Sequence, residues 1–225
     1  MLKIEKFVTL SPEQWEIVIE GARNPMNSWD LMDSYAVEAF LQEDGEYVPE
    51  SYFIGENDMN LLENKLANGG PVHAKYRRMI PVWITLTAPL YWWKEFDTYK
   101  VGTVANSCST MHKIHAKEFT WEDFSFDHLL VYPSEEISKS VIDALNMARE
   151  CYLGCKDPVA KKDWWWQMIQ LLPSSYNQKR TVMLNYEVLV GIYRDRKNHK
   201  LDEWHIFCDW IRELPYSELI TGEEI

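Results

Sequence analysis

Apolar and polar residues alternate at the start of the chain, and further along the apolar residues recur at helical spacing. The alternation over residues 2–7 predicts a strand. Ser11-Pro12-Glu13-Gln14 then has the residues of a capping box, with proline at the first helical position, which predicts a helix to about Arg23. The chain is therefore expected to open with a strand that leads into a helix.

Helices are the most frequent predicted elements in the rest of the chain. A leucine stripe that follows Asn57 ends at Gly69-Gly70, a usual helix terminator. Five more helices are predicted at about residues 90–100, 134–148, 158–172, 186–197 and 202–214. Residues 81–87 and 181–184 are rich in strand-forming side chains, and residues 42–57 and 117–127 have the composition of surface loops. The pattern predicts an α+β fold, with mixed helices around a small, mostly antiparallel sheet.

The composition limits the kinds of protein that this chain can be. At 225 residues with 46% hydrophobic content, it is long enough to bury roughly 70% of its unfolded surface, so one domain over residues 1–225 is expected. The longest apolar runs, such as residues 79–86, are far short of the ~20 residues that a membrane helix needs. The N-terminus has no signal-peptide pattern. We therefore expect a cytoplasmic protein without a membrane partner.

The formal net charge of −12 repels nucleic-acid backbones, so no nucleic-acid polymer is expected as a partner. Positive charge is concentrated at Lys179-Arg180 and at Arg194, Arg196, Lys197 and Lys200. These side chains could bind the phosphate of a mononucleotide or dinucleotide. They could equally be solvated residues that offset the dipole at a helix end.

Disulfide and metal chemistry are not expected. The four cysteines are too few and too scattered for a disulfide framework, so buried reduced thiols are their expected state, and only Cys108 lies in a region of possible chemistry. His112 and His115 have the spacing of a helical pair, but no third ligand stands at a recognisable motif spacing. The sequence therefore predicts no metal site.

A pattern near the C-terminus combines a helix breaker, an amide and basic residues at fixed steps. Asn185 lies twelve residues after Pro173, and Arg196 follows eleven residues later. Trp204 comes next, in the last predicted helix. This spacing resembles the C-terminal half of the flavin-dependent thymidylate synthases, which have Leu-Pro, an asparagine, a Leu-x-x-Arg-like helix end and then Ala-Gln-Trp-Glu, with one inserted residue needed before Trp204.

The resemblance covers roughly residues 59–212 and includes the middle of the chain. The leucine stripe, His73 and the segment from Ala88 to Tyr91 follow the family's helix, Gly-His turn and Pro-Ile-Phe sequence. The family signature continues with Arg-His-Arg, Ser, Asn-Glu, Ser and Arg-Tyr. With one insertion, this chain has Thr103, Asn106, Ser109 and His112 at the later positions. The arginines are absent, and Lys100 keeps a positive charge without the planar, bidentate grip of a guanidinium.

The resemblance implies a methyltransferase that forms dTMP from dUMP. In such enzymes reduced FAD donates the hydride, methylenetetrahydrofolate supplies the carbon and NADPH reduces the flavin, so the protein mainly supplies binding, orientation and charge. Carried over to this chain, the resemblance implies catalytic roles for Arg196 and Ser109, cofactor contacts at His73, Lys100, Asn106 and Asn185, and substrate contacts at Ser107, Arg180 and Arg196. Arg196 stands at the position that contacts the uracil nucleotide.

Two interpretations follow from the loss of the arginines. In the first, the enzyme keeps the family chemistry with a rearranged anion site. In the second, the fold is kept while the function has changed, to a flavin or nucleotide enzyme for another pyrimidine or to a noncatalytic binding or assembly protein. The eleven tryptophans could stack a flavin, a pterin or a base, or they could pack in the core and between subunits. The resemblance also implies a homotetramer with the flavin between subunits.

Overall fold

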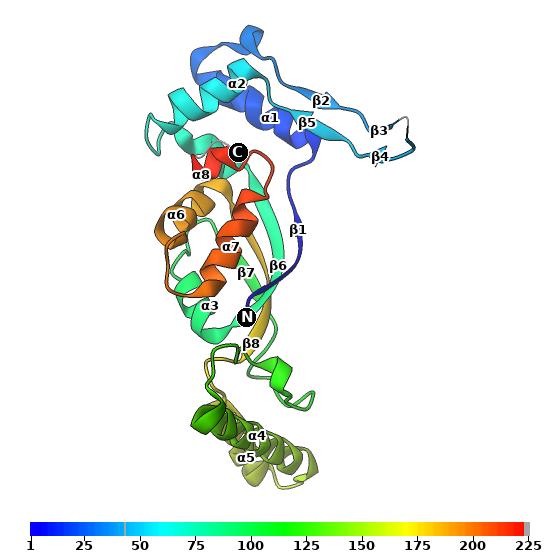
Figure 1. The fold of residues 1–225 in the computed structure, drawn as a ribbon, viewed down its shortest axis with the longest axis vertical. Coiled ribbons are helices and arrows are strands. Elements are labelled where there is room, and N and C mark those ends of the chain that lie inside the picture. Colours follow the sequence, from blue (N-terminus) through cyan, green and yellow to red (C-terminus); the bar gives the residue numbers. More distant parts are fainter. Residues whose placement is uncertain (43, 223–225) are drawn as a thin grey trace. The chain divides into compact units, whose positions relative to one another are not determined.

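A four-stranded sheet stands among helices in the computed structural model, which describes residues 1–42 and 44–222 (Figure 1). The strand order is β1 (Lys3–Val8), β6 (Pro81–Pro89), β8 (Asn177–Asn185) and β7 (Val104–Ser107). The Tyr186 amide donates to the Ile80 carbonyl at 3.1 Å and the Leu90 amide donates to the Tyr176 carbonyl at 2.9 Å, so β6 and β8 run antiparallel. The predicted α+β fold is confirmed.

The seven predicted helices occur in the predicted order. The α-helices are α1 (Pro12–Arg23), α2 (Glu56–Asn60), α3 (Leu90–Phe96), α4 (Glu136–Gly154), α5 (Pro158–Leu171), α6 (Tyr186–Arg196), α7 (Asp202–Arg212) and α8 (Glu218–Thr221). Short 3-10 or π-helical segments are η1 (Asn24–Met26), η2 (Trp29–Leu31), η3 (Leu61–Ala67), η4 (Ala74–Met79), η5 (Trp121–Asp123) and η6 (Val131–Glu135). The second predicted helix occurs as α2 followed by η3, whereas α8 and the other short segments were not predicted. The expected capping box is present, since the Ser11 amide donates to Gln14 Oε1 at 2.9 Å.

The described residues form two compact units, and each unit draws on several stretches of the chain. The first contains residues 1–5, 85–98 and 105–181, and the second contains residues 6–84, 99–104 and 182–222. Because β6 and β8 each contribute residues to both units, neither unit is a continuous piece of sequence. The single domain over residues 1–225 stays a prediction.

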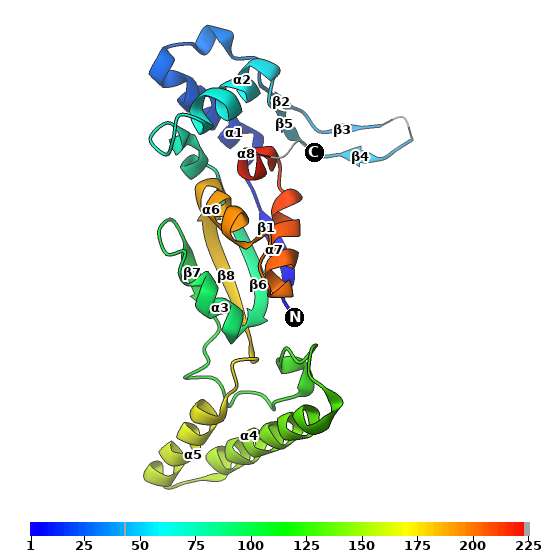
Figure 2. The same cartoon turned by 60° about the vertical axis from the view of Figure 1, so that its left-hand side comes forward.

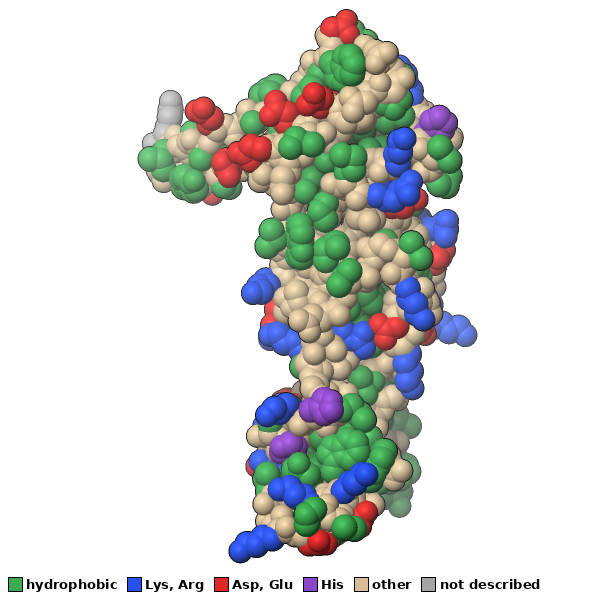
Figure 3. Space-filling model, turned by 180° about the vertical axis from the view of Figure 1, so that it is seen from behind, with side chains coloured by type: hydrophobic (Ala, Val, Ile, Leu, Met, Phe, Trp, Pro, Cys, Tyr) green, Lys and Arg blue, Asp and Glu red, His purple; other side chains and the backbone are tan. Residues whose placement is uncertain are grey.

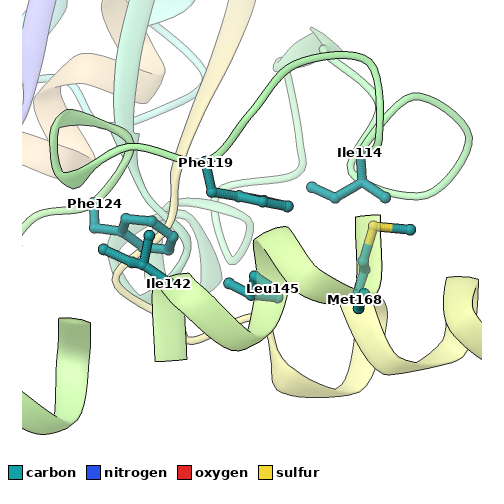
Figure 4. Close-up of a cluster of buried hydrophobic side chains, with 7 residues drawn as sticks. Ile114, Phe119, Phe124, Ile142, Leu145 and Met168 are labelled. Carbon is teal, nitrogen blue, oxygen red and sulfur yellow. The ribbon is translucent and has the colours of Figure 1, made fainter. Parts of the chain in front are cut away.

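The first unit contains the helical hairpin of α4 and α5, which lie side by side in both ribbon views (Figure 2). A cluster of buried side chains packs against these helices (Figure 4), and its members are Ile114, Phe119, Phe124, Ile142, Leu145, Ala148 and Met168. Phe119 and Phe124 come from the segment 117–127, which we expected to be a surface loop. That expectation is wrong for these two rings, because the segment closes the core of the helical hairpin.

The second unit contains α1, α2 and α6–α8, together with two small antiparallel ladders. The ladders pair β2 (Tyr35–Val37) with β5 (Ser51–Phe53) and β3 (Phe40–Leu41) with β4 (Tyr47–Val48). The expected surface loop over residues 42–57 is therefore partly wrong, since it contains β4, β5 and the start of α2, while Glu43 lies outside the described residues. These short strands have few buried side chains, so the alternation that reveals a half-buried strand is missing.

The cysteines are free thiols, as expected, but most of them are not buried. Cys208 is buried, Cys151 and Cys155 are half-buried, and Cys108 is exposed. Burial raises the pKa of the Cys208 thiol to about 11, so this thiol is protonated at neutral pH. The expectation of four buried thiols is thus wrong for Cys108 in particular.

Candidate functional site

Arg196 is the last residue of α6 and is half-buried between two aromatic side chains. Its Nε donates a hydrogen bond to the Tyr99 hydroxyl at 2.9 Å. The guanidinium carbon lies 4.8 Å from the centre of the Trp204 ring and 5.6 Å from the centre of the Tyr99 ring. A planar cation held against two rings has a fixed orientation, which a lysine ammonium could not reproduce.

Asn185 ends β8 and caps α6, because its Oδ1 accepts a hydrogen bond from the Val188 amide at 3.1 Å. The segment 99–104 passes beside this cap. A Cβ atom on Gly102 would lie 3.1 Å from both Asn185 Nδ2 and Val188 Cγ2. The same short segment therefore contacts the first turn of α6 through Gly102 and the last residue of α6 through Tyr99. Lys100 stands between these two contacts and is exposed.

The structure thus brings three of the predicted site residues into one assembly within the second unit. Asn185 and Arg196 are separated by the length of α6, roughly 16 Å at 1.5 Å per residue, so one small ion could not touch both. A ligand of nucleotide or dinucleotide size could. Thr103 adds an unmatched polar group to this assembly, since its buried Oγ1 has no hydrogen-bond partner in the described part of the chain. Thr103 matches a serine of the family signature in the sequence, but it was not predicted to be a site residue.

Arg180 lies on β8 in the first unit, and its charge is already paired. Its Nη1 contacts Asp97 Oδ1 at 2.7 Å, and its Nε donates to Gln178 Oε1 at 2.9 Å. The guanidinium carbon also lies 4.2 Å from the centre of the Trp93 ring. An anionic substrate would have to displace Asp97 to reach this arginine, which weakens the substrate role predicted for Arg180.

Gln178 connects Arg180 to the strand that carries the predicted polar residues. Its Nε2 donates to the Cys108 carbonyl at 2.9 Å, and the Cys108 amide donates to the Lys179 carbonyl at 2.9 Å. Asn106 and Ser107 are exposed at the end of β7, just before this contact. Gln178 is only 6% exposed, and it was not predicted as a site residue, because a glutamine in a strand matches no motif.

Ser109 and His73 have more local surroundings. The Ser109 hydroxyl oxygen accepts hydrogen bonds from the amides of His112 at 2.8 Å and Met111 at 3.3 Å, so it stabilises its own turn. His73 is exposed at the start of η4 and lines a cavity of about 230 Å³ together with Tyr76 and other residues of the second unit. It does not line the same site as Arg196.

The two basic clusters of the sequence differ in the structure. Lys179 forms an ion pair with Glu5, and Arg194 forms one with its neighbour Asp195 at 2.9 Å. Beyond Arg196, the end of α6 and the outer face of α7 border a cavity of about 400 Å³ lined in part by Lys197, His205 and Arg212. Lys179 and Arg180 therefore each face a carboxylate, and Lys197 is the member of the other cluster that lines this cavity.

In residues 1–42 and 44–222, no three His, Cys, Asp or Glu side chains are grouped to hold a metal ion. No helix in this part of the chain is both long and apolar enough to span a membrane.

The fold is that of the flavin-dependent thymidylate synthases, and the similarity extends over almost the whole chain. Two crystal structures of the Helicobacter pylori enzyme ThyX, both complexed with FAD and dUMP, each cover 99% of this chain at 14% sequence identity. Their TM-scores are 0.59 and 0.61, and the match covers 97% and 96% of the respective ThyX chains. No protein-family model and no curated protein sequence matches the chain. The predicted resemblance is confirmed at the level of the fold.

Proposed function

We propose that the protein is a flavin-dependent thymidylate synthase-like enzyme that converts dUMP to dTMP. Its expected cofactor is FAD, with methylenetetrahydrofolate and NADPH as co-substrates. The observation that carries the proposal is the aromatic clamp on Arg196, which orients a guanidinium at the sequence position that matches the nucleotide contact of the family. The likeness to ThyX complexes with FAD and dUMP supports it.

The assembly at the start of α6 has groups that fit the phosphates of FAD. Lys100 supplies a cation, and the buried Thr103 hydroxyl supplies a hydrogen bond that no described residue uses. Asn185 lies at the positive end of the α6 dipole, where anions are stabilised. Bound reduced FAD would supply the hydride for the reaction. We assign Lys100 and Asn185 of the second unit to holding FAD, and the assignments of His73 and Asn106 to the cofactor stay predictions from the resemblance.

The chain's own residues would bind and orient the nucleotide. Arg196 can donate to a uracil carbonyl or to a phosphate from a fixed direction, because its plane is set by Tyr99 and Trp204. The substrate role of Ser107 and the catalytic role of Ser109, whose oxygen accepts hydrogen bonds from two amides of its own turn, stay predictions from the resemblance. Arg180 would contribute only after releasing Asp97. Homotetramer formation and a cytoplasmic location belong to the same proposal.

The second candidate function is a flavin or nucleotide enzyme that acts on another pyrimidine. It is favoured by the absent Arg-His-Arg signature and by the Arg180–Asp97 ion pair, since both reduce the positive charge available to a phosphate. A noncatalytic binding or assembly protein on the same fold is the outcome if no flavin binds.

Titration with FAD, followed by flavin fluorescence and calorimetry, tests the cofactor. We expect saturable binding that weakens when Lys100 is replaced by Met, whereas Lys94→Met, an exposed lysine on α3, should leave it unchanged. The loaded protein should then form dTMP from dUMP when methylenetetrahydrofolate and NADPH are added. Flavin binding without dTMP would favour another pyrimidine, and the absence of heat and of any fluorescence change would remove both flavin functions.

A further inference from the structure

The two small ladders, within residues 35–42 and 44–53, form an extended ribbon, which we call the arm. In Figure 3 its visible surface shows hydrophobic and acidic side chains and no basic ones. Large apolar residues are exposed at its tip, where Leu41 is 70% exposed, Tyr47 is 65% exposed and Phe40 is 50% exposed. A two-stranded ribbon is at best marginally stable in water, so its apolar tip would gain from a partner surface.

The charge of the arm indicates what such a partner must offer. Residues 24–64 contain ten carboxylates and no lysine or arginine, so this stretch carries most of the net charge of −12. Glu38, Asp44, Glu46 and Glu50 of the arm are all exposed. Two arms would repel each other, because like charges would face one another across the contact. The complementary surface is therefore apolar, bordered by cations, and not another arm.

Such a surface is present in the second unit, at the cavity between α1, η3 and η4. Its walls include Leu66, Val72 and Met79, and Lys75 and His73 are also among the lining residues. None of the described lining residues is a carboxylate. The cavity measures about 230 Å³, whereas an engineered apolar cavity of ~150 Å³ already accepts benzene. It can therefore receive one leucine or aromatic side chain.

We propose that the tip of the arm docks into this cavity on a second copy of the chain. The arm points away from α2 and the segment that follows it in both ribbon views, so its tip does not reach the cavity of its own chain (Figures 1 and 2). Leu41 or Tyr47 fills the cavity, and the arm's carboxylates face Lys75. Each chain carries one arm and one cavity, so two copies close a symmetric dimer by reciprocal exchange.

The experiment uses two variants of the full chain and their mixture. The arm variant is Leu41→Ser with Tyr47→Ser, and the cavity variant is Val72→Asp with Lys75→Glu, all at exposed positions. Light scattering should give each variant half the mass of the wild-type assembly. The matched control, Val159→Ser on α5, removes an equally exposed valine and should keep the wild-type mass. Circular dichroism checks that every variant is folded.

The mixture decides whether the arm of one chain meets the cavity of another. Mixing the two variants pairs an intact arm with an intact cavity, so differently tagged chains should co-purify and regain the mass lost by each variant alone. A mixture that stays at the mass of the separate variants overturns the proposal. So does a wild type that is monomeric, or an arm variant that keeps the wild-type mass. Flavin binding is measured on the same samples, so a failure of the arm to dock can be distinguished from a failure of the proposed flavin-dependent function.

Discussion

At the scale of single residues, the arginines of this chain differ in what surrounds them. Arg180 is paired with Asp97, and Arg194 is paired with Asp195. Arg196 packs on the rings of Tyr99 and Trp204, which orient its guanidinium. Because two rings set the plane of this guanidinium, Arg196 is suited to a planar, directional contact with a ligand.

Replacement of Arg196 by lysine should weaken dUMP binding by about 1–3 kcal/mol, because the charge remains but the planar contact disappears. Calorimetric titration with dUMP measures the difference. Arg194→Lys is the matched control, since this arginine is 74% exposed and should tolerate the change. Equal affinities of wild type and Arg196→Lys would reject the substrate role, and no dUMP binding by the wild type would indicate another substrate.

Gly102 is a second residue whose identity the structure explains. Its φ of +81° lies in the left-handed region, and an added Cβ would crowd Asn185 and Val188 at 3.1 Å. We expect Gly102→Ala to lower the free energy of unfolding by about 1–2 kcal/mol. Urea denaturation measures this loss.

The control for Gly102 is Gly154→Ala at the end of α4, where an added Cβ meets nothing within 4 Å. That variant should be as stable as the wild type or slightly more stable. If Gly102→Ala unfolds at the same urea concentration as the wild type, the close approach of segment 99–104 to α6 is wrong.

At the scale of elements, one face of the sheet is connected by polar side chains from three strands. Glu5 on β1 accepts a hydrogen bond from Thr87 on β6 at 2.9 Å and pairs with Lys179 on β8. The hydrogen bond from Lys179 lowers the pKa of Glu5 from its ordinary value of 4.5. Because the pKa of Glu5 is lower in the folded than in the unfolded protein, the ion pair with Lys179 stabilises the fold at pH values above the unfolded-state pKa. This stabilisation is lost as the pH falls through the folded-state pKa of Glu5.

We therefore expect Glu5→Gln to be less stable than the wild type at pH 7, by at most about 1 kcal/mol because the pair is partly exposed. The difference in stability should shrink as the pH is lowered below ~4, because the Glu5 carboxyl of the wild type then becomes protonated and neutral, like the glutamine amide. Thermal denaturation between pH 7 and pH 3 measures it. Glu150→Gln, at an exposed position on α4, should show no such pH-dependent difference, and a Glu5→Gln deficit that persists at pH 3 would contradict the ion-pair explanation.

The elements that the sequence predicted well are those with a buried face and a clear start signal. Asp157 and Asn185 were expected to open helices, and both side chains accept hydrogen bonds from the amides three residues on. The strand β7 was missed, since all four of its residues are exposed and show no alternation. Residues 44–53 of the arm lie in the segment that was predicted to be a loop, and most of them are exposed as well.

At the scale of the whole molecule, apolar surface remains exposed in the first unit as well as on the arm. Leu130, Val131 and Tyr132 are each more than 70% exposed, and Trp166 on α5 is 41% exposed. Contiguous exposed apolar residues of this kind mark interaction surfaces. Light scattering at micromolar concentration should therefore give the mass of a homotetramer, about four times the 26.7 kDa of one chain. A mass near 26.7 kDa would contradict both the tetramer and the docking of the arm.

The sequence by itself determined the helices, the main strands and the family of folds. Capping residues, prolines and apolar spacing act within a few positions along the chain, so they can be read without the structure. It also singled out Arg196 and Asn185, whose spacing is set by one helix.

Only the tertiary structure decided which of the predicted residues share a site. Arg180 meets Asp97 across 83 positions, and Arg196 meets Tyr99 across 97 positions. No local pattern encodes such contacts, because they arise when β6, β7 and β8 pair and bring distant segments together. The sequence shows where each basic residue stands in the chain, while folding determines which carboxylates and aromatic rings surround it.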